Sequence, residues 1–293
     1  MKIDKNKFSG IFTALLTPFD ANDRINEKEL EKLVKFNIEK GVTGFYVGGS
    51  TAEAFLLSTD ERKQIMDIVK STAPNHTLMA HIGSLNESEA IELGQYAKKL
   101  SYDLVSSVTP FYYKFSFEEI KNYYIRLADA SELPMLVYYF PAFSGVNMGM
   151  SDMAAFLEDD RFAGIKYTSN DFFTMEQCKS HFPDKLLYNG FDEMILSGLA
   201  MGVDGGIGST YNFMADKFVK IRELFNAGQI KEAQAIQQEA NKIITVLCKI
   251  GVMQAEKEVL NQLGFDFGIC RKPFHEPTAE EKELIRTTIL PYI

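Results

Sequence analysis

Cysteine and histidine are scarce in this sequence, and neither is spaced as a metal site would require. The three cysteines, Cys178, Cys248 and Cys270, lie far apart and form no C-x-x-C pair, which argues against a disulfide framework or a zinc knuckle. The four histidines include no H-E-x-x-H motif. His81, at the expected end of a strand, is best explained as a packed or hydrogen-bonded side chain. We therefore expect no metal site.

Positive charge and long apolar runs are also scarce. The 31 Lys and Arg residues are outnumbered by 40 Asp and Glu, which gives a net charge of −9 at pH 7 and argues against binding of a nucleic-acid backbone. No apolar run approaches the ~20 residues of a membrane span. The first ten residues, MKIDKNKFSG, are charged and lack the apolar core of a signal peptide. We expect a cytoplasmic protein that binds neither nucleic acid nor membrane.

What the sequence does contain is an alternation of short apolar runs with segments of helical period. Most of the runs are continuously apolar, as parallel strands buried on both faces should be. One expected helix begins at Asn26 and stops at Gly41, and another begins at Ser58 or Thr59 and closes before Pro74. Shorter helices fit 151–158 and 172–181. The expected strands lie in 10–18, 42–49, 77–83, 103–110, 134–141, 162–168, 185–190 and 203–210.

Eight strand–helix units of this kind predict an α/β fold in which eight parallel strands close into a (β/α)8, or TIM, barrel. An open doubly wound sheet is the alternative, but no G-x-G-x-x-G fingerprint follows the first strand. After about residue 215 the pattern becomes purely helical. We expect a catalytic barrel over residues 1–215 and a C-terminal α-helical domain over residues 216–293.

Polar residues stand at the carboxyl ends of most of the expected strands, where barrels of this kind place their functional groups. Tyr138 and Lys166 are 28 residues apart, close to one strand–helix unit, so they would lie on neighbouring strands ~5 Å apart. Burial would lower the pKa of the lysine and make it a nucleophile, with the phenol as proton carrier. The alternative is a lysine paired with an acid such as Asp192.

Three other stretches carry weaker signals. GGST at 48–51 places the hydroxyls of Ser50 and Thr51 beside glycines, an arrangement that can hold a carboxylate or form a simple turn. Glu53 is either a buried partner of this loop or solvated. Asp192 and Glu193 fit an acid/base pair, metal ligands, acceptors for sugar hydroxyls, or a helix N-terminus. GGIGS at 205–209 is placed where such barrels often bind an anion or a polar substrate group.

Seven segments, in order along nearly the whole chain, resemble the N-acetylneuraminate lyases, the sialic acid aldolase branch of the dihydrodipicolinate synthase superfamily. Lys166, Tyr138 and GGST are typical of the superfamily, whereas FDE with GGIGSTYN is more specific to the lyase branch. The segments are GGSTAEAF (48–55), TPFYYKFSFEE (109–119), VYYFPAFSGV (137–146), GIKYTSND (164–171), YNGFDEM (188–194), DGGIGSTYN (204–212) and CRKPF (270–274).

The resemblance implies reversible aldol cleavage of N-acetylneuraminate to N-acetylmannosamine and pyruvate, without a cofactor, by a homotetramer. Lys166 matches the lysine that forms a Schiff base with C2 of pyruvate, and Tyr138 matches the tyrosine that shuttles protons. Ser50 and Thr51 match residues that hold the pyruvate carboxylate, Thr51 also serving in the proton relay. Thr168 matches a residue near the reacting hydroxyl. The positions that match contacts to the sugar portion are Gly190, Asp192, Glu193, Gly208 and Ser209.

One further match concerns assembly, and two positions depart from the usual pattern. Tyr112 most nearly matches a tyrosine that reaches into a neighbouring subunit's site, with Tyr113 as the alternative register. Ala52 replaces the usual glycine of GGSTGE and would cost ~1 kcal/mol if the backbone there required a positive φ. Tyr139 stands where asparagine is common, which affects the packing behind Tyr138.

Three other functions fit these residues less well. Dihydrodipicolinate synthases usually carry an arginine after the catalytic tyrosine, but here the segment is PAFSG, with Phe143 at the matching place, and phenylalanine cannot form a bidentate pair with a carboxylate. Other pyruvate-dependent aldolases fit FDE less well. A non-enzymatic sialic acid binder would have no need of both Lys166 and Tyr138.

Overall fold

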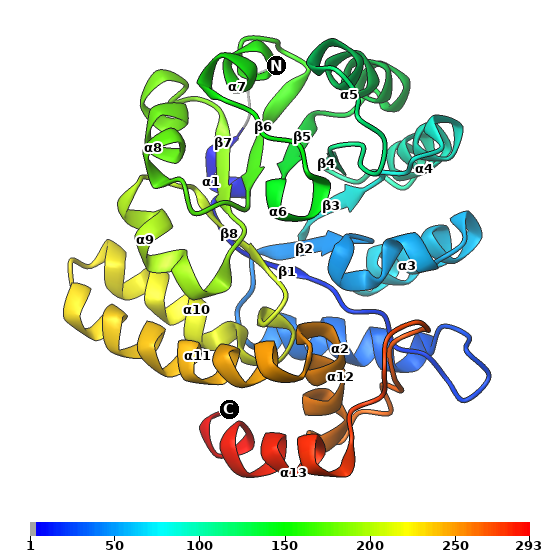
Figure 1. Cartoon of the computed structure of the whole chain (residues 1–293), viewed down its shortest axis with the longest axis vertical. Coiled ribbons are helices and arrows are strands. Elements are labelled where there is room, and N and C mark those ends of the chain that lie inside the picture. The colour runs from blue at the N-terminus through cyan, green and yellow to red at the C-terminus, as the bar shows by residue number, and fades with distance from the viewer. Residues whose placement is uncertain (1–3) are drawn as a thin grey trace.

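Eight parallel strands close into a barrel, and each pairs with the next in chain order until β8 pairs with β1 (Figure 1). This computed structural model describes residues 4–293. The predicted TIM barrel is confirmed, and every strand falls inside an apolar run of the sequence. The strands are β1 (Gly10–Ala14), β2 (Gly44–Val47), β3 (Thr77–His81), β4 (Leu104–Val108), β5 (Met135–Tyr139), β6 (Phe162–Tyr167), β7 (Leu186–Asn189) and β8 (Gly205–Gly208).

Helices surround the barrel, and their ends follow the signals in the sequence. The helix expected to end at Gly41 does so, with Gly41 at a φ of 85°. Of the two expected N-caps, Ser58 is the one used, and it forms a reciprocal capping box with Glu61. The helices are α1 (Lys5–Phe8), α2 (Glu27–Glu39), α3 (Thr59–Thr72), α4 (Glu87–Lys99), α5 (Phe117–Ser131), α6 (Pro141–Ser144), α7 (Met150–Leu157), α8 (Phe172–His181), α9 (Ile195–Ala200) and α10 (Tyr211–Asn226).

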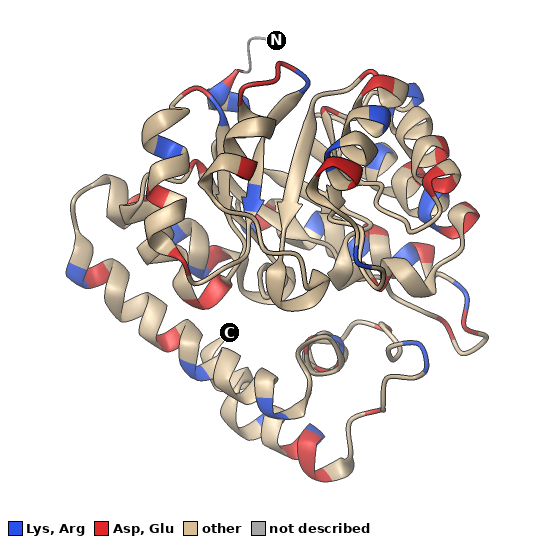
Figure 2. Ribbon diagram, turned by 45° about the horizontal axis from the view of Figure 1, so that its top comes forward, with Lys and Arg blue, Asp and Glu red and all other residues tan. Residues whose placement is uncertain are grey.

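The last part of the chain is helical and packs on one side of the barrel (Figure 1). It contains α11 (Ile230–Ile250), α12 (Val252–Gln262) and α13 (Ala279–Thr288). The division between residues 1–215 and 216–293 stays a prediction. Among residues 4–293, no helix has both the length and the apolar character needed to cross a membrane. Positive and negative residues are interspersed along the outer helices (Figure 2).

Two apolar clusters hold the fold. The larger one lies between the strands and the helices that cover them. The smaller one fills the barrel interior and includes Phe12, Tyr46, Leu136, Tyr138 and Tyr188. Side chains on successive strand positions point alternately inward and outward, so Tyr138 belongs to the interior cluster and its neighbour Tyr139 to the outer one.

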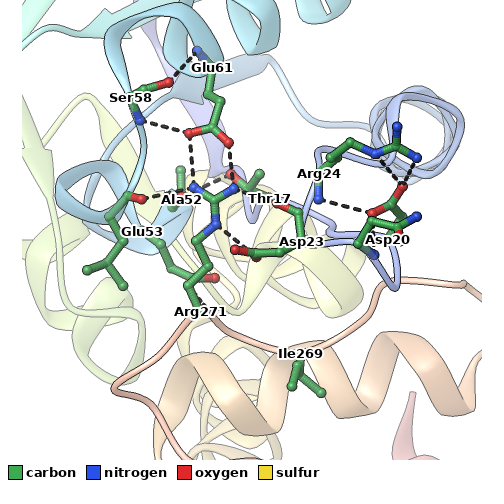
Figure 3. A network of polar contacts seen from close by, with 12 residues as sticks. Thr17, Asp20, Asp23, Arg24, Ala52, Glu53, Ser58, Glu61, Ile269 and Arg271 are labelled. Carbon is green, nitrogen blue, oxygen red and sulfur yellow. Dashed lines mark hydrogen bonds and ion pairs between the residues drawn. The ribbon is translucent and has the colours of Figure 1, made fainter.

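The segment after α12 is tied to the barrel by Arg271 (Figure 3). Its guanidinium donates to both carboxylate oxygens of Glu61 and to Asp23 Oδ1. The backbone N–H of Arg271 donates to Glu53 Oε2 over 2.7 Å. One residue from the C-terminal part therefore holds α3 and the loop that follows β2.

We expect Arg271→Gln to lower the free energy of unfolding by about 2 kcal/mol, because Glu61 and the carbonyls that the guanidinium bonds lose charge-assisted partners. Arg24→Gln is the matched control: Arg24 also binds a carboxylate, that of Asp20, but it is exposed (Figure 3), and such pairs contribute less than about 1 kcal/mol. Urea unfolding of both variants measures the difference. Equal losses in the two variants would contradict the proposed anchoring.

Candidate active site

Lys166 and Tyr138 lie side by side inside the barrel. They are direct partners in the register of β5 with β6, as their spacing predicted. Lys166 Nζ lies 4.1 Å from the ring centroid of Tyr138 and 4.4 Å from that of Tyr46. Both Lys166 and Tyr138 are only 4% exposed. The amine thus sits among aromatic faces and away from bulk water.

The Lys166 amine is desolvated without a counter-ion in contact. Burial lowers its pKa from 10.5 to about 7, against a smaller opposing attraction from Asp192. In the described part of the chain, no carboxylate lies within ion-pair distance of Nζ. Asp192 instead accepts hydrogen bonds from the backbone N–H and the hydroxyl of Thr210, over 2.9 and 2.7 Å. Of the two alternatives left open by the sequence, the nucleophile is therefore favoured over the ion pair.

Tyr138 is a neutral phenol at pH 7. Burial raises its pKa to about 12, although the nearby hydroxyl groups of Ser50 and Thr168 partly offset this. The phenol therefore lies between the loop after β2 and the end of β6, next to the amine. A proton donor and a nucleophile in contact are the groups that carbonyl addition requires.

The GGST stretch turns from β2 into the short 3-10 helix η1 (Ser50–Ala52), where Ser50 and Thr51 are half-buried. Ala52 has an ordinary helical backbone, and its N–H donates to Gly49 O over 3.0 Å. The replacement of glycine by Ala52 is therefore harmless. The positive φ of this turn, 60°, falls on Glu53.

Two buried side chains hold this turn from behind. Glu53 forms an ion pair with Lys257 of α12 at 2.5 Å, with both side chains buried, so Glu53 is the buried partner and not a solvated acid. The ring of His81 lies between Gly48 O and the backbone N–H of Val108, over 3.0 and 3.1 Å. Burial lowers the pKa of His81 well below its usual value, which keeps the ring neutral. The sequence carried no signal for Lys257, which lies more than 200 residues further along the chain.

At the end of the site away from the GGST turn, two buried side-chain oxygens lie next to the backbone of glycine residues. Asp192 Oδ1 and Thr168 Oγ1 have no hydrogen-bond partner among residues 4–293. A Cβ at Gly208 would come within 1.8 Å of Asp192 Oδ1, and one at Gly190 within 1.8 Å of Thr168 Oγ1. Burial raises the pKa of Asp192 to about 6, so it is largely ionised at pH 7. These oxygens are buried acceptors whose hydrogen-bonding capacity no described residue satisfies.

The remaining predicted residues are placed differently. Glu193 is half-buried in the 3-10 helix η3 (Asp192–Met194), and its carbonyl accepts from Asn241. Ser209, directly after β8, donates its hydroxyl proton to Glu256 Oε1 over 2.7 Å. Tyr112 is 84% exposed with a φ of 74°, and its ring packs edge-on against Tyr113.

Two observations concern alternatives raised by the sequence. Tyr139 is buried outside the barrel, where its ring lies 5.2 Å from that of Tyr167; the departure at this position therefore does not touch the amine. Across residues 4–293, no three His, Cys, Asp or Glu side chains gather as metal ligands would.

Comparisons with known proteins agree with this geometry. The profile of the dihydrodipicolinate synthetase family matches residues 7–290. A Pasteurella multocida protein named N-acetylneuraminate lyase is 45% identical over 275 residues, which cover 93% of this chain and 94% of that protein.

Solved structures are similar over nearly their whole length. The crystal structure of CdNal from Clostridium difficile in complex with mannosamine has a TM-score of 0.94 and 40% identity, covering 97% of this chain and 99% of that one. That of N-acetylneuraminate lyase from Fusobacterium nucleatum complexed with pyruvate has a TM-score of 0.91 and 40% identity, covering 97% and 98%.

We expect Lys166→Met to stabilise the protein more at pH 6.5 than at pH 9. The pKa of Lys166 is about 7 in the folded state and 10.5 in the unfolded state. Below pH 7 the wild type bears the full cost of burying a charged ammonium, and this cost is relieved as the pH rises from about 7 to about 10. The advantage of Lys166→Met should shrink by about 2.5 kcal/mol between pH 6.5 and pH 9, measured by urea unfolding. Lys220→Met, on the exposed side of α10, should show no such trend. An advantage that does not vary with pH would contradict the burial argument.

Proposed function

The chain belongs to the dihydrodipicolinate synthetase family, and within it we propose that this enzyme cleaves N-acetylneuraminate to N-acetylmannosamine and pyruvate through a Schiff base on Lys166. The observation that carries the proposal is the desolvated amine of Lys166, with a pKa of about 7, beside the phenol of Tyr138. The similarity to N-acetylneuraminate lyases over more than nine-tenths of the chain supports the choice of substrate.

The first step uses the amine and the phenol together. Because burial lowers its pKa to about 7, the Lys166 amine is available in its uncharged form near neutral pH and attacks the C2 carbonyl of the open-chain substrate. Tyr138 gives its proton to the departing oxygen, water leaves, and a protonated imine remains. No cofactor is needed, because the imine itself is the electron sink.

Cleavage then moves electrons into that sink. The C4 hydroxyl loses its proton to the Tyr138 phenolate, the C3–C4 bond breaks, and its electron pair neutralises the iminium to give an enamine. C4 leaves as the aldehyde carbon of N-acetylmannosamine. Because burial raises the pKa of Tyr138 to about 12, its phenolate is a strong base for this proton. Protonation of the enamine at C3 and hydrolysis release pyruvate and restore the amine.

The two ends of the site would hold the two ends of the substrate. Ser50 and Thr51 bind the carboxylate, and Thr51 relays protons to Tyr138. Thr168 lies next to the phenol, where it can bond the C4 hydroxyl. The residues assigned to the sugar portion are Gly190, Asp192, Glu193, Gly208 and Ser209. The unpartnered oxygens of Thr168 and Asp192 support this assignment.

A dihydrodipicolinate synthase activity is less well supported. Phe143 is 75% exposed and stacks on Phe140 at a centroid distance of 4.3 Å, and it offers no charge to a second carboxylate. Assays of pyruvate release from N-acetylneuraminate, its N-glycolyl analogue and simpler keto acids separate the lyase from other pyruvate aldolases. A pure sialic acid binder would release none.

The enzyme would work in the cytoplasm as a homotetramer, in which Tyr112 reaches the site of a neighbouring subunit. Its exposed ring and its φ of 74° support a role outside its own subunit, since non-glycine residues seldom hold such a backbone without a reason. Light scattering on the purified protein tests the assembly.

Replacing Lys166 by alanine should abolish pyruvate release from N-acetylneuraminate while the protein remains folded, because no other amine lies at this place in the barrel interior described here. Incubation with pyruvate and borohydride followed by peptide mass analysis should find an adduct on Lys166 in the wild type and none in Lys166→Ala. Undiminished pyruvate release by the variant would refute the mechanism.

Tyr138→Phe should lower kcat at least a hundredfold, the usual contribution of a general acid or base, with a much smaller effect on pyruvate binding. The buried ring keeps its packing, so folding should be unchanged. Steady-state kinetics and a pyruvate titration separate the two effects. A kcat equal to that of the wild type would rule out the proton shuttle.

A further inference from the structure

Glu256 is a fully buried carboxyl group that reaches the site from the C-terminal helices. It lies in the middle of α12 and is 0% exposed. Its Oε1 accepts the hydroxyl proton of Ser209 over 2.7 Å, and Ser209 directly follows β8. This contact links α12 to the end of the site assigned to the sugar portion of the substrate.

No cation neutralises this carboxyl group among the described residues. Lys257, the next residue, pairs with Glu53 instead. The titratable groups that face Glu256 are Asp192 of η3, Cys248 of α11 and Cys270 of the segment after α12. Glu256 Oε2 has no hydrogen-bond partner within residues 4–293. Burying a carboxyl group without a cation and with one oxygen unpartnered costs free energy of folding, and an apolar residue at this position of α12 would avoid that cost. The carboxyl group therefore calls for a functional explanation.

We propose that Glu256 is a positioning residue that makes Ser209 a hydrogen-bond acceptor for a hydroxyl or amide N–H donor on the sugar portion of the substrate. The inference rests on the function proposed above and adds the chemistry that this end of the site selects.

A hydroxyl group has one proton to donate and two lone pairs that can accept. When the proton of Ser209 is directed to Glu256, only the lone pairs of Ser209 remain for a ligand. Asp192 Oδ1, beside the neighbouring Gly208, is a second unpartnered acceptor. Two acceptors close together favour a ligand with several donor groups, such as a polyol chain or an acetamido sugar.

The direction of the Ser209 bond depends on the protonation of Glu256. Burial, with the nearby charge of Asp192, raises the pKa of Glu256 to about 8. The neutral acid can either accept from Ser209 or donate to it, whereas the carboxylate can only accept. The acceptor role of Ser209 should therefore strengthen as the pH rises through about 8.

The test compares Glu256→Leu, Glu256→Gln, Ser209→Ala and the double variant Ser209→Ala/Glu256→Leu. With N-acetylneuraminate at pH 7, Glu256→Leu should raise KM about tenfold, with a smaller effect on kcat. Glu256→Gln should stay within about twofold, because its amide oxygen still accepts from Ser209. The double variant should match Ser209→Ala, since Glu256 acts only through Ser209. Trapping of pyruvate on Lys166 by borohydride should be equal in all four.

A pH series supplies a readout that does not depend on the leucine variant folding. From pH 7 to pH 9, the KM of the wild type should fall severalfold relative to that of Glu256→Gln, because only the wild type has a group that titrates at this position. Parallel KM profiles, additive effects of Ser209→Ala and Glu256→Leu, or an unchanged KM in a folded Glu256→Leu would overturn the proposal. A wild type that neither releases pyruvate nor is trapped by it would overturn the proposed function, and this inference with it.

Discussion

The proposed chemistry depends on one uncharged amine kept away from water. A shift of the Lys166 pKa from 10.5 to about 7 represents on the order of 5 kcal/mol that burial removes from the charged form. A surface lysine could not be tuned in this way. The closed barrel makes the burial possible, because it brings the ring of Tyr138 from the adjacent strand β5 and that of Tyr46 from β2, which does not pair with β6, over the amine, and it leaves the ammonium form few hydrogen-bond acceptors. The reactive group is thus a product of the barrel's packing as much as of its own identity.

Several residues that hold the loops of the site in place contact neither the amine nor the phenol. His81 joins the ends of β2, β3 and β4, and Lys257 holds Glu53 at the turn after β2. Arg271 binds Glu53 from the same side, and Glu256 binds Ser209 after β8. Three of these four residues belong to the C-terminal part of the chain. The helices that cover one side of the barrel therefore contribute to the geometry of the site, and their loss would affect more than stability.

Much of this architecture could be predicted from the sequence because it repeats with a regular period. The strand–helix alternation located all eight strands, and the spacing of Tyr138 and Lys166 placed them in register. Spacing could not decide whether Asp192 pairs with Lys166, because the answer lies in the two donors of Thr210. Glu256 was missed for a similar reason: a glutamate inside a helical pattern looks like a solvated residue, and only the folded structure shows that it is buried and bonded to Ser209.

The site also keeps an acid and an amine close together without letting them neutralise each other. Asp192 is held by Thr210 and retains one unpartnered oxygen, which the proposed function assigns to the sugar portion, while its charge raises the pKa of Lys166 by less than burial lowers it. Had Asp192 formed a direct ion pair, the amine would have stayed protonated at pH 7 and could not add to a carbonyl group. Had it been absent, the sugar end would have lost its buried acceptor. The separation of these two groups is what allows the proposed mechanism to use Lys166 as a nucleophile and Asp192 as an acceptor for the sugar portion.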